Sequence, residues 1–295
     1  MYLFCTAVWG LNFIAVKLQG TPIAVEFSLF YRLAGATVIF FVIAAIMRPG
    51  GAPNRRDIVS LAAFGIFNLS ISYLLLYYAT IWISTALVTL LFSLKTTMTP
   101  IALRIFLTEP LHRRIFIGGA IGTLGVAVLL YPTIRFEFTL AEERGIFLAV
   151  LGTLFTAVGD TFTARIANRG IDPIYTNCIG FFVASIILLF VCISSGTHFY
   201  LPDSFQYLSA LLYITLFSSF AAWICYLKVV ARIGAAPSSY MVALFPAVGG
   251  TASVAIGESE VTVFLVMGCL LSCLGAAISL GVGRARAGSK LSEAS

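Results

Sequence analysis

Ten long apolar segments, separated by short stretches rich in glycine, proline and charge, constrain this chain more than any other feature. They fall near residues 2–18, 22–46, 58–79, 82–106, 115–131, 145–164, 174–193, 205–227, 237–256 and 261–282. A helix needs about 20 mostly apolar residues to cross a bilayer, and the hydrocarbon core offers no partner for unpaired backbone groups. The segments therefore predict membrane-spanning helices, because barrel strands would show shorter alternating runs. Ten spans with their short loops use up the 295 residues, so we expect no extramembrane domain.

The composition excludes several classes of protein. Hydrophobic residues make up 60% of the chain and charged residues only 10%, against roughly 25% charged in an ordinary soluble domain. A soluble globular enzyme, a disordered protein and a nucleic-acid binder are all inconsistent with these values. The net charge of +6 is no sign of a nucleic-acid partner, because basic residues in a membrane protein mark its cytoplasmic side. We expect the lipid bilayer to be the main partner of the surface.

The basic residues predict the topology. With the N-terminus in the cytoplasm, three basic residues lie at outer ends, and two more, Arg32 and Lys95, lie inside spans. The other thirteen of the eighteen fall in inner loops or the tail: Arg48, Arg55, Arg56, Arg104, Arg113, Arg114, Arg165, Arg169, Lys228, Arg232, Arg284, Arg286 and Lys290. This bias predicts an even number of spans and both termini in the cytoplasm.

The two halves of the sequence resemble each other. A shift of 149 residues places Gly10 on Gly159, Ala86 on Ala235, Glu109 on Glu258 and Gly119 on Gly268, and a shift of 151 places Pro22 on Pro173. We therefore expect two five-helix units, residues 1–132 and 144–283, followed by a cytoplasmic tail, residues 284–295. Because five is odd, the second unit is inverted in the membrane, as in many transporters.

Several short motifs recur along the chain in a specific order: Trp9, Gly10 and Lys17; Pro22 and Arg32; Tyr77, Tyr78, Ala79 and Ala86; Pro100 and Glu109; Gly118 to Gly125; and Tyr226, Ala235, Pro246, Glu258, Gly268 and Gly275. Together they resemble the motifs of the ten-helix, EamA-type branch of the drug/metabolite transporter superfamily. The resemblance implies an inverted-repeat exporter of small metabolites or amino acids, most similar to the YddG-type exporters of aromatic amino acids. It also implies a multi-pass protein of a bacterial-type inner membrane.

Two cations within the predicted spans are candidate substrate-binding residues. Arg32 lies ten residues after Pro22 and Lys95 thirteen after Trp82, which places both near the middle of the bilayer at 1.5 Å per residue. Intramembrane charge is costly and commonly functional, and cations at this depth suit a carboxylate or a phosphate. The alternative is a structural ion pair or a bond to helix-end carbonyls. Asp160, near the predicted inner end of its span, is a candidate for interfacial ion pairing or for proton coupling.

Neutral polar residues within spans complete the candidate site, and packing between helices is the alternative for each. Thr89 and Thr96 belong to a polar stripe at helical spacing in the fourth span. Deep tyrosine hydroxyls need partners, and Tyr78 and Tyr226 hold similar positions in the two halves. The candidates of this group are Tyr78, Tyr226, Thr89, Thr96, Asn12, Asn177 and Tyr240.

Enzyme motifs are missing from the sequence. The histidines, His112 and His198, fall in loops on opposite sides, and no phosphate-binding P-loop is present. We therefore expect no catalytic residues, no cofactor and no metal. The glycines between Gly118 and Gly125 indicate close helix packing.

Three functions are consistent with these features. The first is a secondary transporter that exports amino acids of broad range, aromatic ones included, by alternating access. The second is an exchanger of organic phosphates or nucleotide-sugars on the same fold. The third is a non-transporting membrane receptor or assembly protein. The sequence does not indicate the energy source or the oligomeric state.

Overall fold

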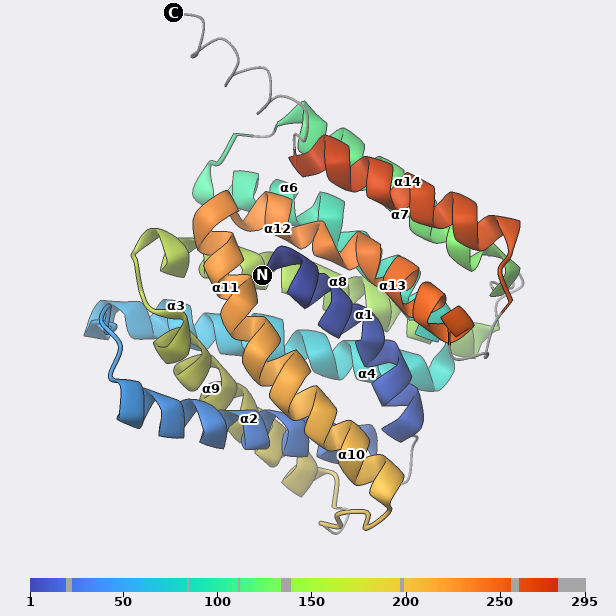
Figure 1. Ribbon diagram of the computed structural model, residues 1–295. Helices are drawn as coiled ribbons and strands as arrows, with labels where there is room; N and C mark the ends of the chain where they lie inside the picture. The colour runs from blue at the N-terminus through green and yellow to red at the C-terminus, as the bar shows by residue number, and fades with distance from the viewer. Residues whose placement is uncertain are drawn as a thin grey trace, which may run out of the picture.

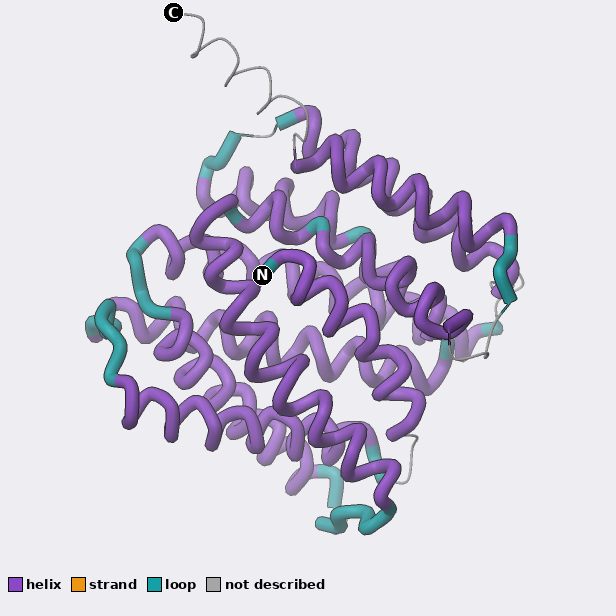
Figure 2. The backbone as a smooth tube through the Cα atoms, viewed as in Figure 1, coloured by secondary structure: helices purple, strands orange, loops and turns teal. Residues whose placement is uncertain are grey.

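In the computed structural model, residues 1–19, 23–83, 85–110, 112–133, 139–196, 199–255 and 260–280 are described. All regular elements in these ranges are helices, which pack into a bundle (Figures 1 and 2). The helices are α1 (Tyr2–Gln19), α2 (Val25–Met47), η1 (Arg55–Asp57), α3 (Ile58–Phe64), η2 (Gly65–Ile71), α4 (Ser72–Trp82), α5 (Thr85–Ser93), α6 (Lys95–Leu107), α7 (Arg113–Leu130), η3 (Tyr131–Thr133), α8 (Leu140–Asn168), α9 (Pro173–Ser194), α10 (Phe205–Tyr213), η4 (Ile214–Ala221), α11 (Ala222–Ile233), α12 (Ala235–Ser239), α13 (Met241–Ala255) and α14 (Val263–Leu280). The predicted tail, residues 284–295, lies outside the described residues.

The ten predicted segments coincide with single helices or with consecutive helices. Within the described residues, eight helical stretches are long and apolar enough to cross a membrane. The other two predicted segments correspond to α1 and to α12 with α13. The all-helical fold class is confirmed, whereas the count of ten spans, the inverted repeat and the cytoplasmic termini stay predictions.

Two π-helical segments interrupt long helices at matching places. The first, η2, runs from Gly65 to Ile71 and the second, η4, from Ile214 to Ala221. Their first residues are 149 positions apart, the same shift that relates the two halves of the sequence. Short π-helical segments inside α-helices frequently mark functional sites, and both of these segments border the central cavity described below.

A close contact between α7 and α14 depends on glycine (Figure 1). A Cβ atom on Gly275 would lie 2.6 Å from the carbonyl oxygen of Gly118 and 2.1 Å from the hydroxyl of Tyr240. The hydroxyl of Tyr240 donates to the carbonyl of Ser272 at 3.2 Å. Small residues allow helix backbones to approach closely in a membrane. The packing role predicted for the glycines between Gly118 and Gly125, which lie in α7, is therefore confirmed.

Substitution of Gly275 by alanine is expected to destabilise the fold. The new methyl group would force apart α7, α14 and Tyr240, and overpacking of this kind costs about 1–3 kcal/mol. The melting temperature of the purified protein in detergent should therefore fall by several degrees. Leu124→Ala, on the exposed face of α7 (56% exposed), is the matched control and should melt near the wild-type temperature. Equal melting of both variants and the wild type would contradict the packing role of Gly275.

Candidate functional site

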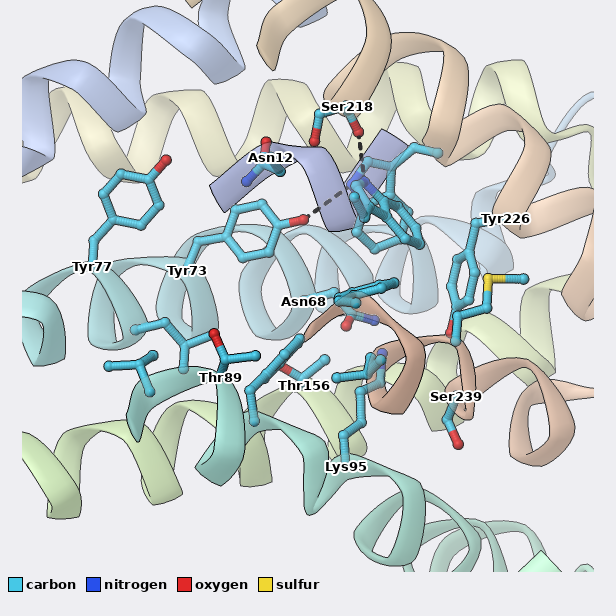
Figure 3. Close-up of a pocket in the computed structure, with 18 of the residues that line it drawn as sticks. Asn12, Asn68, Tyr73, Tyr77, Thr89, Lys95, Thr156, Ser218, Tyr226 and Ser239 are labelled. Atoms are coloured by element: carbon cyan, nitrogen blue, oxygen red, sulfur yellow. Dashed lines mark hydrogen bonds between the residues drawn. The ribbon is translucent and has the colours of Figure 1, made fainter. Parts of the chain in front are cut away.

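A cavity of about 170 Å³ lies at the centre of the bundle (Figure 3). This volume is that of roughly six water molecules at about 30 Å³ each, which is room for a small organic molecule. Its lining within the described residues is Trp9, Asn12, Arg32, Asn68, Tyr73, Leu76, Tyr77, Thr80, Val88, Thr89, Phe92, Lys95, Thr156, Ser218, Trp223, Tyr226, Ser238, Ser239, Met241, Val242 and Phe245. Among these residues, Thr80 near the end of α4 is exposed, whereas Ser238 and Ser239 of α12 are buried, so the cavity opens near the end of α4.

Aromatic rings form the floor of the cavity. Trp9 meets Trp223, Tyr226 and Phe245 edge to face, with ring centroids 5.4–5.8 Å apart. The indole N–H of Trp9 donates to the carbonyl of Ser218 at 2.9 Å, and that of Trp223 donates to the hydroxyl of Tyr73 at 3.1 Å. Because both indole donors are satisfied, the rings offer apolar surface with fixed orientations.

A buried ion pair joins Lys95 and Asp160 at one side of this floor. The Nζ atom of Lys95 lies 3.1 Å from Oδ2 of Asp160, and the two side chains are 6% and 0% exposed. Asp160 also accepts hydrogen bonds from Thr99 at 2.8 Å and from Tyr226 at 3.3 Å. A buried carboxylate is tolerated only when its oxygens are compensated in this way. The positive charge of Lys95 is therefore balanced within the protein.

Local helix geometry produces this arrangement. The chain turns at Leu94 between α5 and α6, so Lys95 begins α6. Thr99 follows four residues later, on the same face of the helix, and both reach the same carboxylate oxygen. The ammonium of Lys95 also lies 5.4 Å from the centre of the Tyr226 ring, where the ring face attracts a cation.

Arg32 is held by neutral groups. Its Nε donates to the hydroxyl of Ser219 at 2.7 Å, Nη1 to that of Tyr77 at 3.2 Å and Nη2 to that of Ser218 at 3.3 Å. The guanidinium carbon lies 5.1 Å from the centre of the Tyr73 ring.

Arg32 has spare hydrogen-bond donors and no carboxylate partner among the described residues. The side chain is 4% exposed, and it has no ion pair with a carboxylate in the part of the chain that the structure describes. Three of the five N–H donors of a guanidinium are used by the hydroxyls. Within the described residues, the cavity wall thus carries one positive charge that no carboxylate pairs with and that can still donate hydrogen bonds.

Among the described wall residues, two amide oxygens have no hydrogen-bond partner. They are Oδ1 of Asn12 and Oδ1 of Asn68. Buried polar atoms are normally satisfied, so unpartnered acceptors in a cavity wall indicate contact with water or with a bound molecule. Figure 3 shows Asn68 at the centre of the cavity, between Tyr73 and Lys95.

The structure brings together five of the nine sequence-predicted site residues. Arg32, Lys95, Tyr226, Thr89 and Asn12 all line the cavity. The sequence left open whether Arg32 and Lys95 bind substrate or form structural ion pairs, and the structure pairs Lys95 with Asp160. Asp160 also lies deeper than predicted, because α8 continues eight residues beyond it to Asn168.

The other four predicted residues lie away from the cavity wall. Thr96 donates to the carbonyl of Ser93 at 2.9 Å and lies against Gly119 of α7. Tyr240 fills the space between α7 and α14. Asn177 is fully buried in α9.

The fourth, Tyr78, follows Tyr77 on α4, and consecutive helical residues point about 100° apart. Only Tyr77 faces the cavity.

Several wall residues were not among those predicted from the sequence: Trp9, Asn68, Tyr73, Tyr77, Ser218 and Trp223. One signal was available for Tyr77, because a shift of 149 residues places it on Tyr226, whereas Tyr78 needs a shift of 148. Ser218 of η4 and Asn68 of η2 are positioned by π-helical turns, and no pattern in the sequence predicts these turns.

Comparisons with known proteins agree with this architecture. The model of the EamA-like transporter family matches residues 1–131 and 143–281. An uncharacterized transporter of Archaeoglobus fulgidus is 26% identical over 277 residues, which cover 90% of this chain and 92% of that protein. One of Clostridium kluyveri is 23% identical over 255 residues, covering 82% and 81%. A solved crystal structure superposes with a TM-score of 0.76 at 16% identity, covering 96% of each chain, and shows the same fold.

Removal of one partner of the Lys95–Asp160 pair is expected to destabilise the protein more than removal of both. A single Lys95→Met or Asp160→Asn substitution leaves a buried group uncompensated, which costs about 3–5 kcal/mol. The double variant removes both charges and should recover much of the loss. Thermal melting of the four proteins in detergent measures this coupling. Additive losses in the double variant would show that the two side chains do not depend on each other.

Proposed function

The chain belongs to the EamA-like transporter family, and from that premise we propose that it is a secondary transporter that exports amino acids by alternating access. The proposal includes ten spans in two inverted five-helix units, residues 1–132 and 144–283, with both termini in the cytoplasm. It places the protein in a bacterial-type inner membrane. Aromatic amino acids are among the proposed substrates of a broad range. As a multi-pass membrane protein of a transporter family, the chain is expected to move its substrate unchanged.

The observation that carries the proposal is the state of Arg32. A guanidinium in the wall of this cavity, hydrogen-bonded to hydroxyls and paired with no carboxylate among the described residues, is costly unless an anionic group occupies the cavity during the working cycle. A carboxylate matches the planar fork of the guanidinium, and charge-assisted bonds of this kind are about twice as strong as neutral ones. Every amino acid carries such a carboxylate, which explains how one site would accept many side chains.

The remaining wall suits the rest of an amino acid. The rings of Trp9, Trp223 and Phe245 provide apolar surface for a side chain, and ring faces and edges pack well against an aromatic substrate. The unpartnered oxygens of Asn12 and Asn68 are acceptors for the N–H groups of an ammonium. Such a wall can accommodate substrate side chains of different shapes, so we expect broad substrate specificity.

The main alternative is an exchanger of organic phosphates or nucleotide-sugars. A dianionic phosphate would need more than one free cation in the wall. Because Asp160 already binds Lys95, only Arg32 among the described lining residues offers uncompensated positive charge. A monoanionic carboxylate therefore fits the charge of the cavity better than a phosphate does.

A non-transporting receptor or assembly protein is the other alternative. The central cavity with its buried cation is not required by such a role, and the curated relatives are named as transporters. Both observations favour transport over a purely structural function.

Uptake into proteoliposomes tests the proposal. Labelled phenylalanine should enter liposomes that contain the wild-type protein, and unlabelled phenylalanine should compete, whereas phenylalaninamide, which lacks the carboxylate, should not. Arg32→Lys keeps the positive charge but loses the planar guanidinium that can donate two hydrogen bonds to one carboxylate. Phenylalanine uptake should therefore fall about tenfold or more, since a charged hydrogen bond contributes about 1.5–3 kcal/mol.

Arg113→Gln, at the exposed start of α7, is the matched arginine control and should transport normally. Uptake of phosphorylated sugars with no uptake of any amino acid would favour the exchanger. If phenylalaninamide competes as well as phenylalanine does, Arg32 does not bind the substrate carboxylate.

A further inference from the structure

A second cavity, of about 450 Å³, lies at the opposite end of the bundle from the opening of the first. Its walls come from Met1, from Gly51 in the turn after α2, from Thr163 near the end of α8, from Pro173 at the start of α9, and from Leu227 and Arg232 of α11. All of these segments lie on the side that the basic residues predict to be cytoplasmic. We refer to this cavity as the inner vestibule and to the first one as the central cavity.

The central cavity and the inner vestibule share a wall that is one side-chain contact thick. Asn68 lines the central cavity and Thr163 lines the inner vestibule. The Nδ2 atom of Asn68 donates to the hydroxyl oxygen of Thr163 at 3.2 Å, and both side chains are 0% exposed. Tyr226 and Leu227, which are adjacent in α11, line the central cavity and the inner vestibule respectively.

The direction of the Asn68–Thr163 bond follows from the hydroxyl. The hydroxyl of Thr163 donates its one hydrogen to the carbonyl of Gly159 at 3.1 Å, so toward Asn68 it can only accept. The amide nitrogen of Asn68 must therefore face Thr163, which leaves Oδ1 as the unpartnered acceptor. Gly159 makes the contact sterically feasible, because a Cβ atom there would lie 2.6 Å from the amide of Asn68.

The Lys95–Asp160–Tyr226 network borders the same wall. Asp160 precedes Thr163 by three residues and so lies one turn away on α8. Lys95 and Tyr226, which both bind Asp160, also line the central cavity. The barrier between the two cavities therefore consists of these polar contacts, which can exchange partners, and of one turn of the η2 segment. Segments of π-helix such as η2 are frequent at functional sites.

We infer that the inner vestibule is the inward half of the transport path and that the Asn68–Thr163 contact, with Lys95, Asp160 and Tyr226 beside it, is its closed inner gate. This inference rests on the proposed function. Opening requires η2 and the end of α8 to separate, which breaks the Asn68–Thr163 hydrogen bond and the stacking of Phe67 on Phe162 and connects the central cavity with the vestibule. Lys228 and Arg232 also line the vestibule, against one acidic residue, Asp172, so the local charge favours entry of a carboxylate-bearing substrate.

A cross-link across the gate provides the first test. Asn68→Cys and Thr163→Cys are combined, and the reconstituted double variant is treated with a short bifunctional methanethiosulfonate. Bridging should lock the gate and lower phenylalanine uptake about tenfold or more, and a reductant should restore it. Both single variants carry the same six native cysteines. Thr163→Cys, which lies outside the central cavity, should respond to the reagent by less than about twofold. Asn68→Cys, which lies in the proposed substrate site, is measured before and after treatment, and only the loss beyond its own response is assigned to the bridge. Unchanged uptake by the bridged protein would overturn the inference.

Thiol labelling provides a second test that does not require an active double variant. In Thr163→Cys, the thiol should react with a membrane-impermeant maleimide added on the vestibule side, and saturating phenylalanine should change the labelling rate by about threefold or more through a shift between conformations. Arg113→Cys, exposed at the same predicted side, is the reference and should label at a constant rate. If saturating phenylalanine leaves the labelling rate of Thr163→Cys unchanged, the inference is overturned.

The two proposals fail in different ways. If the wild-type protein moves phosphorylated sugars and no amino acid, the amino acid function is wrong, and the cross-link is then tested with the sugar phosphate as the probe. If amino acids move equally well with and without the bridge, the function stands and the gate is wrong.

Discussion

The ion pair between Lys95 and Asp160 is the interaction on which the rest of the structure depends. Neither charge can lie in a membrane interior alone, and each is compensated by the other with help from Thr99 and Tyr226. The pair joins α6 to α8 and α11 and therefore joins the two predicted five-helix units at the floor of the cavity. Its cost is tolerated because all of its partners are polar and close, and its position makes it a natural boundary between the two sides of the membrane.

The same pair determines the charge that a substrate meets. With Lys95 compensated, Arg32 is the uncompensated cation of the described cavity wall, held by Ser218, Ser219 and Tyr77. A wall with one free guanidinium, fixed indole rings and unpartnered amide oxygens suits a small molecule with one carboxylate, an N–H-rich group and an apolar part. Amino acids combine these three features, and the membership of a transporter family explains why such a cavity lies in the middle of a membrane protein.

The sequence predicted the helices well, because each apolar segment must be long enough to cross the bilayer and must satisfy its own backbone. It also predicted the burial of Arg32 and Lys95 and the close packing of the glycines in α7. It did not predict the partner of Lys95, because Asp160 lies 65 positions later in the sequence and its depth depends on the true end of α8. Tyr77 was missed in favour of Tyr78 because the register between the two halves is uncertain by one residue, and one residue turns a helical side chain by about 100°. The π-helical turns that present Asn68 and Ser218 have no signature in the sequence.

Counterflow in proteoliposomes tests the central claim most directly. Liposomes are loaded with unlabelled phenylalanine, or with a phosphorylated sugar, and are then diluted into a trace of labelled phenylalanine. A carrier that alternates access to one carboxylate site should transiently accumulate the label above its equilibrium level with the amino acid inside and not with the sugar phosphate inside. The account is contradicted if liposomes loaded with amino acid show no overshoot of labelled phenylalanine, while liposomes loaded with sugar phosphate do show an overshoot of labelled sugar phosphate.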